Sequence, residues 1–217
     1  MKIALIGATG FVGSAILTEL LQRGHQVTAL VRDAAKAPAS LSSQSGVTVV
    51  QADAQQADQV ASAARGHDAL VSAYNAGWGN PNLHDDFLAG SRAVTAGTKA
   101  AAVPRLLVVG GAGSLYVAPG VQLVDTPGFP AEWRDGASAA REALKLLQSE
   151  DDLAWTFISP PALLQPGERT GHFRLGGDDL LMNGDQPAAI STADLAVAIV
   201  DEIEQPRHVR RRFTAGY

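Results

Sequence analysis

The sequence predicts an α/β fold in which a doubly wound parallel sheet is covered by helices on both faces. Short apolar runs of strand length alternate along the chain with segments of helical periodicity. Such near-continuous runs are typical of strands buried on both faces, as in a parallel sheet flanked by helices. The alternation has no break rich enough in Gly, Ser or Pro to separate domains. We therefore expect one domain over residues 1–217.

Each expected strand is an apolar run between polar or glycine-containing segments. The strands are Lys2–Ile6, Gln26–Val31, Val47–Gln51, Ala69–Ala73, Leu106–Val109 and Trp155–Ile158. Val12, Ile16 and Leu20 repeat every four residues and predict the first helix, which Gly24 ends as the C′ residue. Further helices are expected over Asp58–Ala64, Asp86–Ala102, Gly136–Ser149 and Thr192–Glu204.

Three local patterns complete this assignment. Ser191-Thr192-Ala193-Asp194 reads as a capping box at the start of the last helix. Ala34–Gly46 is a run of small and polar residues and predicts a loop. Pro160–Pro187 is rich in Gly and Pro and predicts an irregular excursion above the sheet, which would form a small C-terminal substrate region.

Composition excludes several classes of function. The net charge of −5 disfavours nucleic-acid binding, and we expect the short basic run Arg210–Arg212 to be a solvated strand edge. The chain has no cysteine and no histidine pair at ligand spacing, so no disulfide, thiol nucleophile or metal site is expected. No apolar run approaches the roughly 20 residues that span a bilayer, and the N-terminus does not resemble a signal peptide. We expect a soluble cytoplasmic protein.

The stretch Gly7-Ala8-Thr9-Gly10-Phe11-Val12-Gly13 joins the first strand to the first helix. Glycines at this place let backbone amides approach a pyrophosphate, and the helix N-terminus adds partial positive charge. The alternative is a tight βα turn that holds no ligand. The motif follows a strand, opens an amphipathic helix and precedes a second strand about 20 residues on, which is the context it requires. We expect it to bind a dinucleotide.

This glycine spacing, with Ala8-Thr9 inside it, resembles the extended and atypical branches of the short-chain dehydrogenase/reductase superfamily, which share a Rossmann fold. Landmarks that the resemblance requires follow the later strands in order. They are Arg32-Asp33, Asp53-Ala54, Ser72-Ala73-Tyr74-Asn75-Ala76-Gly77, Gly110-Gly111-Ala112-Gly113-Ser114 and Ser159-Pro160-Pro161. The resemblance implies that the glycine stretch and these strand ends line the cofactor site, with Asp53 against the adenine and the segment from Ser72 beside the ribose and nicotinamide.

Two phrases carry a closer likeness. The chain is similar to the flavin reductase and biliverdin-IX-beta reductase group, and to bacterial NADH-flavin reductases. This similarity lies in Leu30-Val31-Arg32-Asp33 and in Asp53-Ala54-Gln55-Gln56-Ala57-Asp58. Members of such groups also carry the superfamily label of epimerase/dehydratase. The resemblance implies an NAD(P)H-dependent oxidoreductase.

The end of the second strand bears on the choice of cofactor. A carboxylate there binds the ribose hydroxyls of NAD, whereas a guanidinium binds the extra phosphate of NADP. Arg32 and Asp33 offer both groups, and neighbours on an extended chain point to opposite sides. In the group that the chain resembles the arginine takes the phosphate, so NADP(H) is favoured and NAD(H) is the alternative. The alternative for Arg32 is a solvated loop residue that pairs with Asp33.

Most of the superfamily reduces carbonyls with a Tyr-x-x-x-Lys pair, and this chain has none, because no lysine follows any tyrosine at that spacing. Trp133 stands in the corresponding region and cannot act as an acid. Ser114 is the remaining catalytic candidate; it either orients the substrate or caps a turn. Hydride addition to a flavin, quinone or tetrapyrrole delocalises the charge, so holding two planes in contact is most of the protein's task. We expect such a planar acceptor.

The acceptor is expected above the carboxyl ends of the strands. Flat surfaces would come from Tyr74, Trp78, Tyr116 and Trp133, and the other wall from Gln165–Phe173. His84 and His172 are candidate proton relays, although a lone loop histidine is more often solvated. Two other functions stay open: a non-catalytic NAD(P)-binding redox sensor, and a nucleotide-sugar epimerase or dehydratase. The missing pair and the short C-terminal half disfavour the latter.

Overall fold

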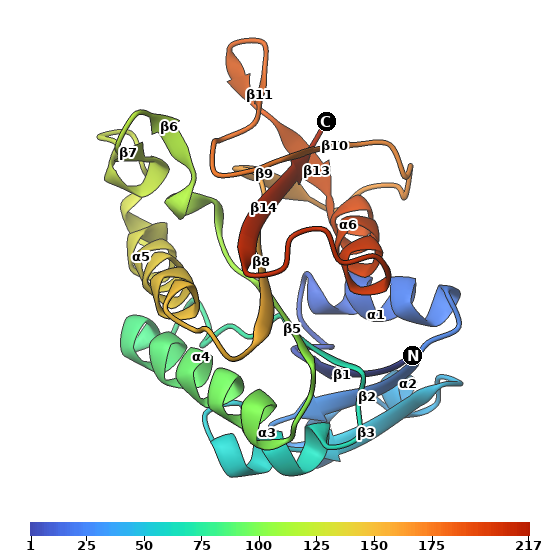
Figure 1. Ribbon diagram of the computed structural model, residues 1–217. Coiled ribbons are helices and arrows are strands. Elements are labelled where there is room, and N and C mark those ends of the chain that lie inside the picture. The colour runs from blue at the N-terminus through green and yellow to red at the C-terminus, as the bar shows by residue number, and fades with distance from the viewer.

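The computed structural model describes all 217 residues and is built around an eight-stranded sheet (Figure 1). Its strands are β1 (Lys2–Ile6), β2 (Gln26–Val31), β3 (Val47–Gln51), β4 (Ala69–Ser72), β5 (Arg105–Val109), β8 (Ala154–Ser159), β10 (Arg174–Gly176) and β14 (Arg211–Gly216). They lie in the order β10-β14-β8-β5-β4-β1-β2-β3, and every pairing is parallel except that of β10 with β14. The predicted doubly wound α/β fold is confirmed.

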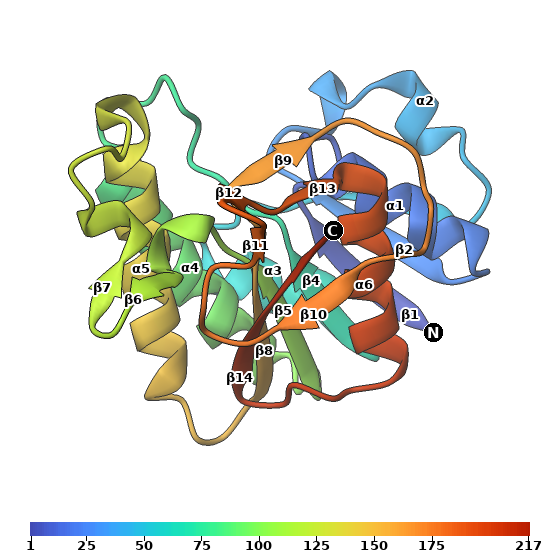
Figure 2. The same cartoon turned by 90° about the horizontal axis from the view of Figure 1, so that it is seen from above.

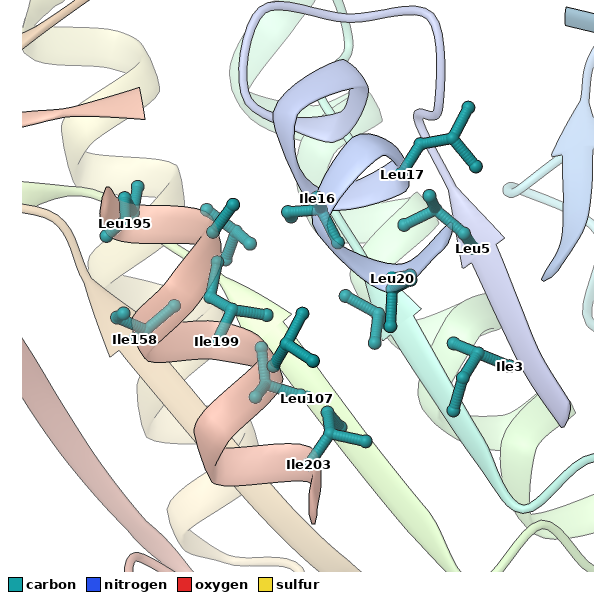
Figure 3. Close-up of a cluster of buried hydrophobic side chains, with 14 of the residues drawn as sticks. Ile3, Leu5, Ile16, Leu17, Leu20, Leu107, Ile158, Leu195, Ile199 and Ile203 are labelled. Carbon is teal, nitrogen blue, oxygen red and sulfur yellow. The ribbon is translucent and has the colours of Figure 1, made fainter. Parts of the chain in front are cut away.

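Helices cover both faces of the sheet. They are α1 (Gly13–Gln22), α2 (Ala39–Ser42), α3 (Ala57–Ala64), α4 (Leu83–Ala100), α5 (Ala131–Gln148) and α6 (Thr192–Glu204). Figures 1 and 2 show α1 and α6 on one face and α3, α4 and α5 on the other. Ile16 and Leu20 of α1 and Ile199 of α6 belong to one buried cluster over the sheet (Figure 3). No helix is both long and apolar enough to cross a membrane.

The starts of two helices were placed too late. The helix predicted from Asp86 begins at Leu83, and the one predicted from Gly136 begins at Ala131. Gly136 lies inside α5, and a glycine is needed there because the ring of Trp78 occupies the space beside it: a Cβ would lie 2.8 Å from a ring carbon. The glycine that was expected to start the helix is therefore a site of close packing inside it.

The arginine run is solvated only in part: Arg210 and Arg211 are exposed, as expected, but Arg212 is not. β14 lies between β8 and β10 inside the sheet, and Arg212 is buried at 7% exposure rather than solvated. Its guanidinium donates to the carboxylate of Asp178 at 2.8 Å and to the backbone oxygen of Ser114 at 2.8 Å. These partners make the burial of its charge tolerable.

The two segments predicted to be irregular contain regular structure. Ala34–Gly46 includes the 3-10 helix η1 (Ala34–Lys36) and α2. Pro160–Pro187 contains β9 (Leu163–Gln165), β10, and the hairpin of β11 (Met182–Asn183) and β12 (Gln186–Pro187). β9 pairs with β13 (Ala189–Ser191), and a second hairpin joins β6 (Tyr116–Ala118) to β7 (Val121–Gln122). The turns η2 (Ala112–Ser114) and η3 (Leu123–Asp125) flank that second hairpin.

Candidate functional site

The glycine turn between β1 and α1 needs two of its three glycines for its own shape. Gly7 has a φ of +82°, and a Cβ there would clash with the carbonyl oxygen of Ala73. A Cβ at Gly13 would clash with the carbonyl oxygen of Gly7. Gly10 is exposed, and a Cβ there would lie 3.2 Å from that same oxygen. The shape of the turn alone therefore accounts for glycine at positions 7 and 13. It accounts less well for glycine at position 10.

Backbone amides at this turn are left without partners. The N–H groups of Thr9, Phe11 and Val12 donate no hydrogen bond within the protein. No side chain caps the N-terminus of α1, whereas the hydroxyl of Ser191 accepts the amide of Asp194 at the start of α6. Free amides at a helix N-terminus favour an anionic ligand. The turn can therefore act as a diphosphate cradle.

A groove of about 580 Å³ runs from this turn along the ends of β2 and β3 to the loop after β4. Predicted cofactor residues that line it are Gly7, Ala8, Thr9, Arg32, Asp33, Asp53, Ala54 and Tyr74. Lining residues absent from the prediction include Lys36, Gln55, Asn75, Asn80 and Asp86. A larger hollow of about 690 Å³ lies between α4 and α5, but its lining is mainly apolar and includes no residue of the glycine turn.

Arg32 and Asp33 differ sharply in their partners. Asp33 accepts the amide of Ala35 at 3.1 Å, as the cap of η1, and pairs with the ammonium of Lys36 at 3.1 Å. Arg32 makes no hydrogen bond or ion pair within the protein and lines the groove. The alternative in which Arg32 pairs with Asp33 is wrong. Lys36, three residues from Asp33, was missed because its role depends on the turn made by η1.

Tyr74 and Asp53 are both held by neighbouring groups. The hydroxyl of Tyr74 donates to the backbone oxygen of Asp86 at 3.0 Å and accepts from the side chain of Gln55 at 3.0 Å. Burial raises the pKa of Tyr74, which makes it a poorer acid. Asp53 accepts the amide of Gln55 at 2.9 Å through one carboxylate oxygen. Asp53 therefore keeps acceptor capacity for a ligand, whereas Tyr74 does not offer a free proton.

The other predicted cofactor residues stand near the groove without lining it. Ser72, Ser159 and Pro160 are buried at the ends of β4 and β8. The ring of Phe157 covers Gly110, and a Cβ on Gly110 would clash with it. A Cβ on Gly111 would lie 3.7 Å from the Cβ of Ala140, an ordinary contact distance. Ala73 backs the glycine turn through its carbonyl oxygen. Ser72 instead lines the larger hollow between α4 and α5.

Ser114 is only 1% exposed. Its hydroxyl accepts from Arg212 at 3.0 Å, and its backbone oxygen accepts from Arg212 and from Gln122. This burial argues against a substrate-orienting hydroxyl and for the alternative in which Ser114 holds the turn after β5.

Of the predicted aromatic surfaces, two are open. Trp78 and Trp133 are 63% and 52% exposed. Tyr116 lines a separate hollow of about 530 Å³ between the β6–β7 hairpin and residues 179–182. The ring of Tyr74 packs against Phe87, with centroids 5.9 Å apart. The expected stacking set therefore reduces to the two tryptophans.

The segment Gln165–Phe173, predicted as the second wall, lies against α1 and α6 and lines no part of the groove. Arg169 binds the carboxylate of Glu19 on α1 at 2.7 Å. The carboxylate of Asp194 accepts the amides of Thr170 and Gly171, each at 2.8 Å. Only half of the predicted capping box forms. The hydroxyl of Ser191 accepts the amide of Asp194, but the carboxylate of Asp194 binds this segment rather than the amide of Ser191.

Neither predicted histidine relay lines the groove. His84 lies 3.1 Å from Asp85 and 3.3 Å from Glu142, so it bridges α4 to α5. The hydrogen bond with Asp85 is the main cause of its raised pKa. His172 is exposed in the segment held by Asp194, and its ring makes no hydrogen bond. His172 therefore agrees with the alternative of a solvated loop histidine, whereas His84 lies inside α4 and pairs with carboxylates.

Comparison with known proteins places this geometry in a family. Residues 7–206 match the model of the NAD(P)H-binding family. YwnB of Bacillus subtilis is 42% identical over 99% of this chain and 97% of its own length. A "putative epimerase" from Bacteroides thetaiotaomicron is 42% identical with a TM-score of 0.90, over 100% of this chain and 96% of that one. A "putative NADH-flavin reductase" from Streptococcus pneumoniae is 33% identical with a TM-score of 0.81, over 100% and 99%. The chain belongs to the NAD(P)H-binding family, whose model covers its glycine turn and the ends of β2 and β3 that line the groove.

Proposed function

We propose that the protein is an NADPH-preferring reductase that transfers hydride to a flavin or a similar delocalised acceptor. The unpartnered amides of Thr9, Phe11 and Val12 at the uncapped start of α1 carry this proposal. They present several donors to one diphosphate, and the dipole of α1 adds to the attraction. The adjoining groove has a volume in the range of small-molecule and cofactor sites.

The preference for NADPH rests on the charges at the end of β2. Arg32 has no partner within the protein, so its guanidinium is free to bind a phosphate in a bidentate contact. Lys36 lies on the same rim, where its ammonium pairs with Asp33. Asp33, which would bind the ribose hydroxyls of NADH, is already used by Ala35 and Lys36. The free charge on this rim is therefore positive.

The choice of a delocalised acceptor rests on the lack of a free acid in the groove. Tyr74 is hydrogen-bonded on both sides, and Ser114 is buried beneath Arg212. A reduced nicotinamide, when bound, supplies the hydride. The chain contributes orientation rather than a proton, which suits acceptors whose product is protonated later by water. The resemblance to the Streptococcus pneumoniae protein supports a flavin as that acceptor.

A direct test follows NADPH absorbance in the presence of FMN. The wild type should oxidise NADPH, and Gly10→Asp should abolish turnover because it puts bulk and negative charge into the cradle at the glycine that the turn needs least. Gly128→Asp is the matched control, since Gly128 is exposed and a Cβ there meets no atom within 4 Å. Turnover that is equal in the two variants would overturn the cradle.

The same experiment separates the reductase from a redox sensor. A sensor would bind NADPH saturably and yet leave it unoxidised by FMN, by a quinone and by a dye. An epimerase would convert a nucleotide sugar without net NADPH consumption.

A further inference from the structure

We infer that Trp78 and Trp133 form a platform for the isoalloxazine ring of the acceptor, and that Gly136 is the positioning residue that seats Trp78 on it. The inference deepens the proposed function and rests on it for the identity of the ligand. None of the three residues lines the groove that would hold the dinucleotide. The platform is therefore a second, adjacent surface.

Trp78 is exposed and yet held in place. The residue is 63% exposed, but the edge of its six-membered ring lies against the backbone of α5 at Gly136. A Cβ at Gly136 would lie 2.8 Å from Cζ3 and 3.1 Å from Cη2 of Trp78, and 3.4 Å from a methyl carbon of Leu83. Only glycine lets the ring lie this close. The contact fixes one edge of the indole and leaves much of its surface open.

Trp133 precedes Gly136 by three residues on α5, so the two positions lie on adjacent turns of one helix face, about 5–6 Å apart. The indole of Trp133 is 52% exposed. Neither tryptophan pairs with another aromatic ring in the protein. Two of the three tryptophans of the chain therefore offer unpartnered flat surfaces at one place. Tryptophan presents large contact area with few rotatable bonds, which favours stacking on a planar ligand.

The loop that carries Trp78 also forms one end of the groove. Asn75, Gly77 and Asn80 line the groove on either side of Trp78 in the sequence. Asn75 accepts the amide of Gly77 at 2.7 Å, and Asn80 donates to the carboxylate of Asp86 at 2.7 Å. Figure 2 shows this loop, between β4 and α4, rising beside the start of α5. The loop thus places the platform directly beyond the end of the groove.

This arrangement suits a tricyclic flavin ring. The ring is flat, aromatic and wider than one indole, so it can cover Trp78 and reach toward Trp133 one turn away. Stacking on an aromatic side chain does not require a proton donor, which agrees with the lack of a free acid in the groove.

The test measures FMN binding by quenching of flavin fluorescence, with NADP⁺ present, alongside steady-state turnover with NADPH. Trp78→Ala and Gly136→Ala should each raise the Kd and the KM for FMN about tenfold, the size expected for loss of one stacked ring. Affinity for NADPH should stay within about twofold, because the groove is intact. Trp78→Phe should recover part of the loss. Gly128→Ala is the control for adding a methyl group at an unobstructed glycine, and should change nothing.

The double variant Trp78→Ala/Gly136→Ala decides the role of Gly136. If Gly136 acts only by seating Trp78, the double variant should match Trp78→Ala in FMN affinity. Additive losses would overturn that role. The thermal unfolding midpoint of each variant shows whether weaker FMN binding comes from loss of the fold or from loss of the platform alone.

The outcomes for the platform and for the reductase are distinct. Turnover of FMN that is unaffected by Trp78→Ala overturns the platform and keeps the reductase. FMN binding that depends on Trp78, without any NADPH oxidation, supports the platform and overturns the reductase. Absence of FMN binding overturns the platform, and oxidation of NADPH by a quinone would still support the reductase.

Discussion

The carbonyl oxygen of Gly7 occupies the space that a side chain on Gly13 would need, so the two ends of the glycine turn touch backbone to backbone. This contact brings the start of α1 directly over the end of β1. It separates the glycines into two that the fold requires and one, Gly10, that stands open to a ligand.

Gly13→Ala should therefore damage the fold as well as the site. The methyl group cannot be accommodated without moving α1 off β1, and overpacking of this kind costs about 1–3 kcal/mol. Urea unfolding should show a lower midpoint than for the wild type. Gly10→Ala is the comparison: its Cβ would lie 3.2 Å from the Gly7 oxygen, and its midpoint should stay close to that of the wild type. Equal midpoints for all three proteins would contradict the assignment.

Arg32→Ala should weaken NADPH binding far more than NADH binding. A charged hydrogen-bonding contact contributes about 1.5–3 kcal/mol, which corresponds to a loss of about 10- to 100-fold in Kd for NADPH. Titration calorimetry with both cofactors measures the difference. Lys36→Ala should give a smaller loss in the same direction. Equal losses for the two cofactors would rule out a phosphate contact at Arg32.

Ser114→Ala tests whether that hydroxyl takes part in the chemistry. General acids contribute about 10²- to 10⁴-fold to a rate. Because Ser114 is buried and its hydroxyl accepts from Arg212, we expect kcat with FMN to change by less than about tenfold, a fall smaller than the loss of an acid would cause. Thermal stability should fall as the Arg212 contact is lost. A hundredfold fall in kcat with unchanged stability would restore Ser114 as a catalytic residue.

Stability should fall in acid partly through Asp194. Burial alone raises the pKa of this carboxyl, but hydrogen bonds from Thr170, Gly171 and Tyr217 outweigh it and hold the pKa below its usual range. Because the folded pKa lies below the unfolded one, this stabilisation is present above about pH 4 and is lost as the pH falls through the folded value.

Asp194→Asn makes that contribution measurable. It should lower the free energy of unfolding at pH 7 by about 1–3 kcal/mol, because it leaves buried donors poorly paired. The difference from wild type should shrink as the pH is lowered. Urea midpoints at pH 7 and at pH 3 measure it, and a difference that is independent of pH would count against the carboxylate's role.

The fold was predictable because its determinants are local. The bounds of β1, β2, β3 and α6 agree with those expected from apolar runs and from the Ser191 cap. The shape of the glycine turn was predictable for the same reason, since all its residues lie within one turn, and phosphate binding there stays a prediction. Errors arose where one residue's role depends on a distant partner: Gly136 on Trp78, Asp194 on Thr170, and Arg212 on Asp178.

The candidate site was predictable in part. Arg32 and Asp33 stood out as neighbours of opposite charge, but only the turn of η1 shows that Asp33 is already paired with Lys36. Gln165–Phe173 has the composition of a substrate loop and is instead drawn to α1 by the buried carboxylate of Glu19. The sequence shows that Glu19 lies on an apolar helix face and needs a partner. It does not show that the partner is Arg169, which lies 150 residues further along the chain.

The uncapped start of α1 would link the stability of this protein to its supply of coenzyme. A helix whose first amides have no partner of their own leaves part of its folding free energy to an outside anion. Occupancy at a concentration 100-fold above the dissociation constant adds about 2.7 kcal/mol to the folded state. A cell short of pyridine nucleotide would then hold less of the folded protein, so abundance itself would follow metabolic state without any regulator.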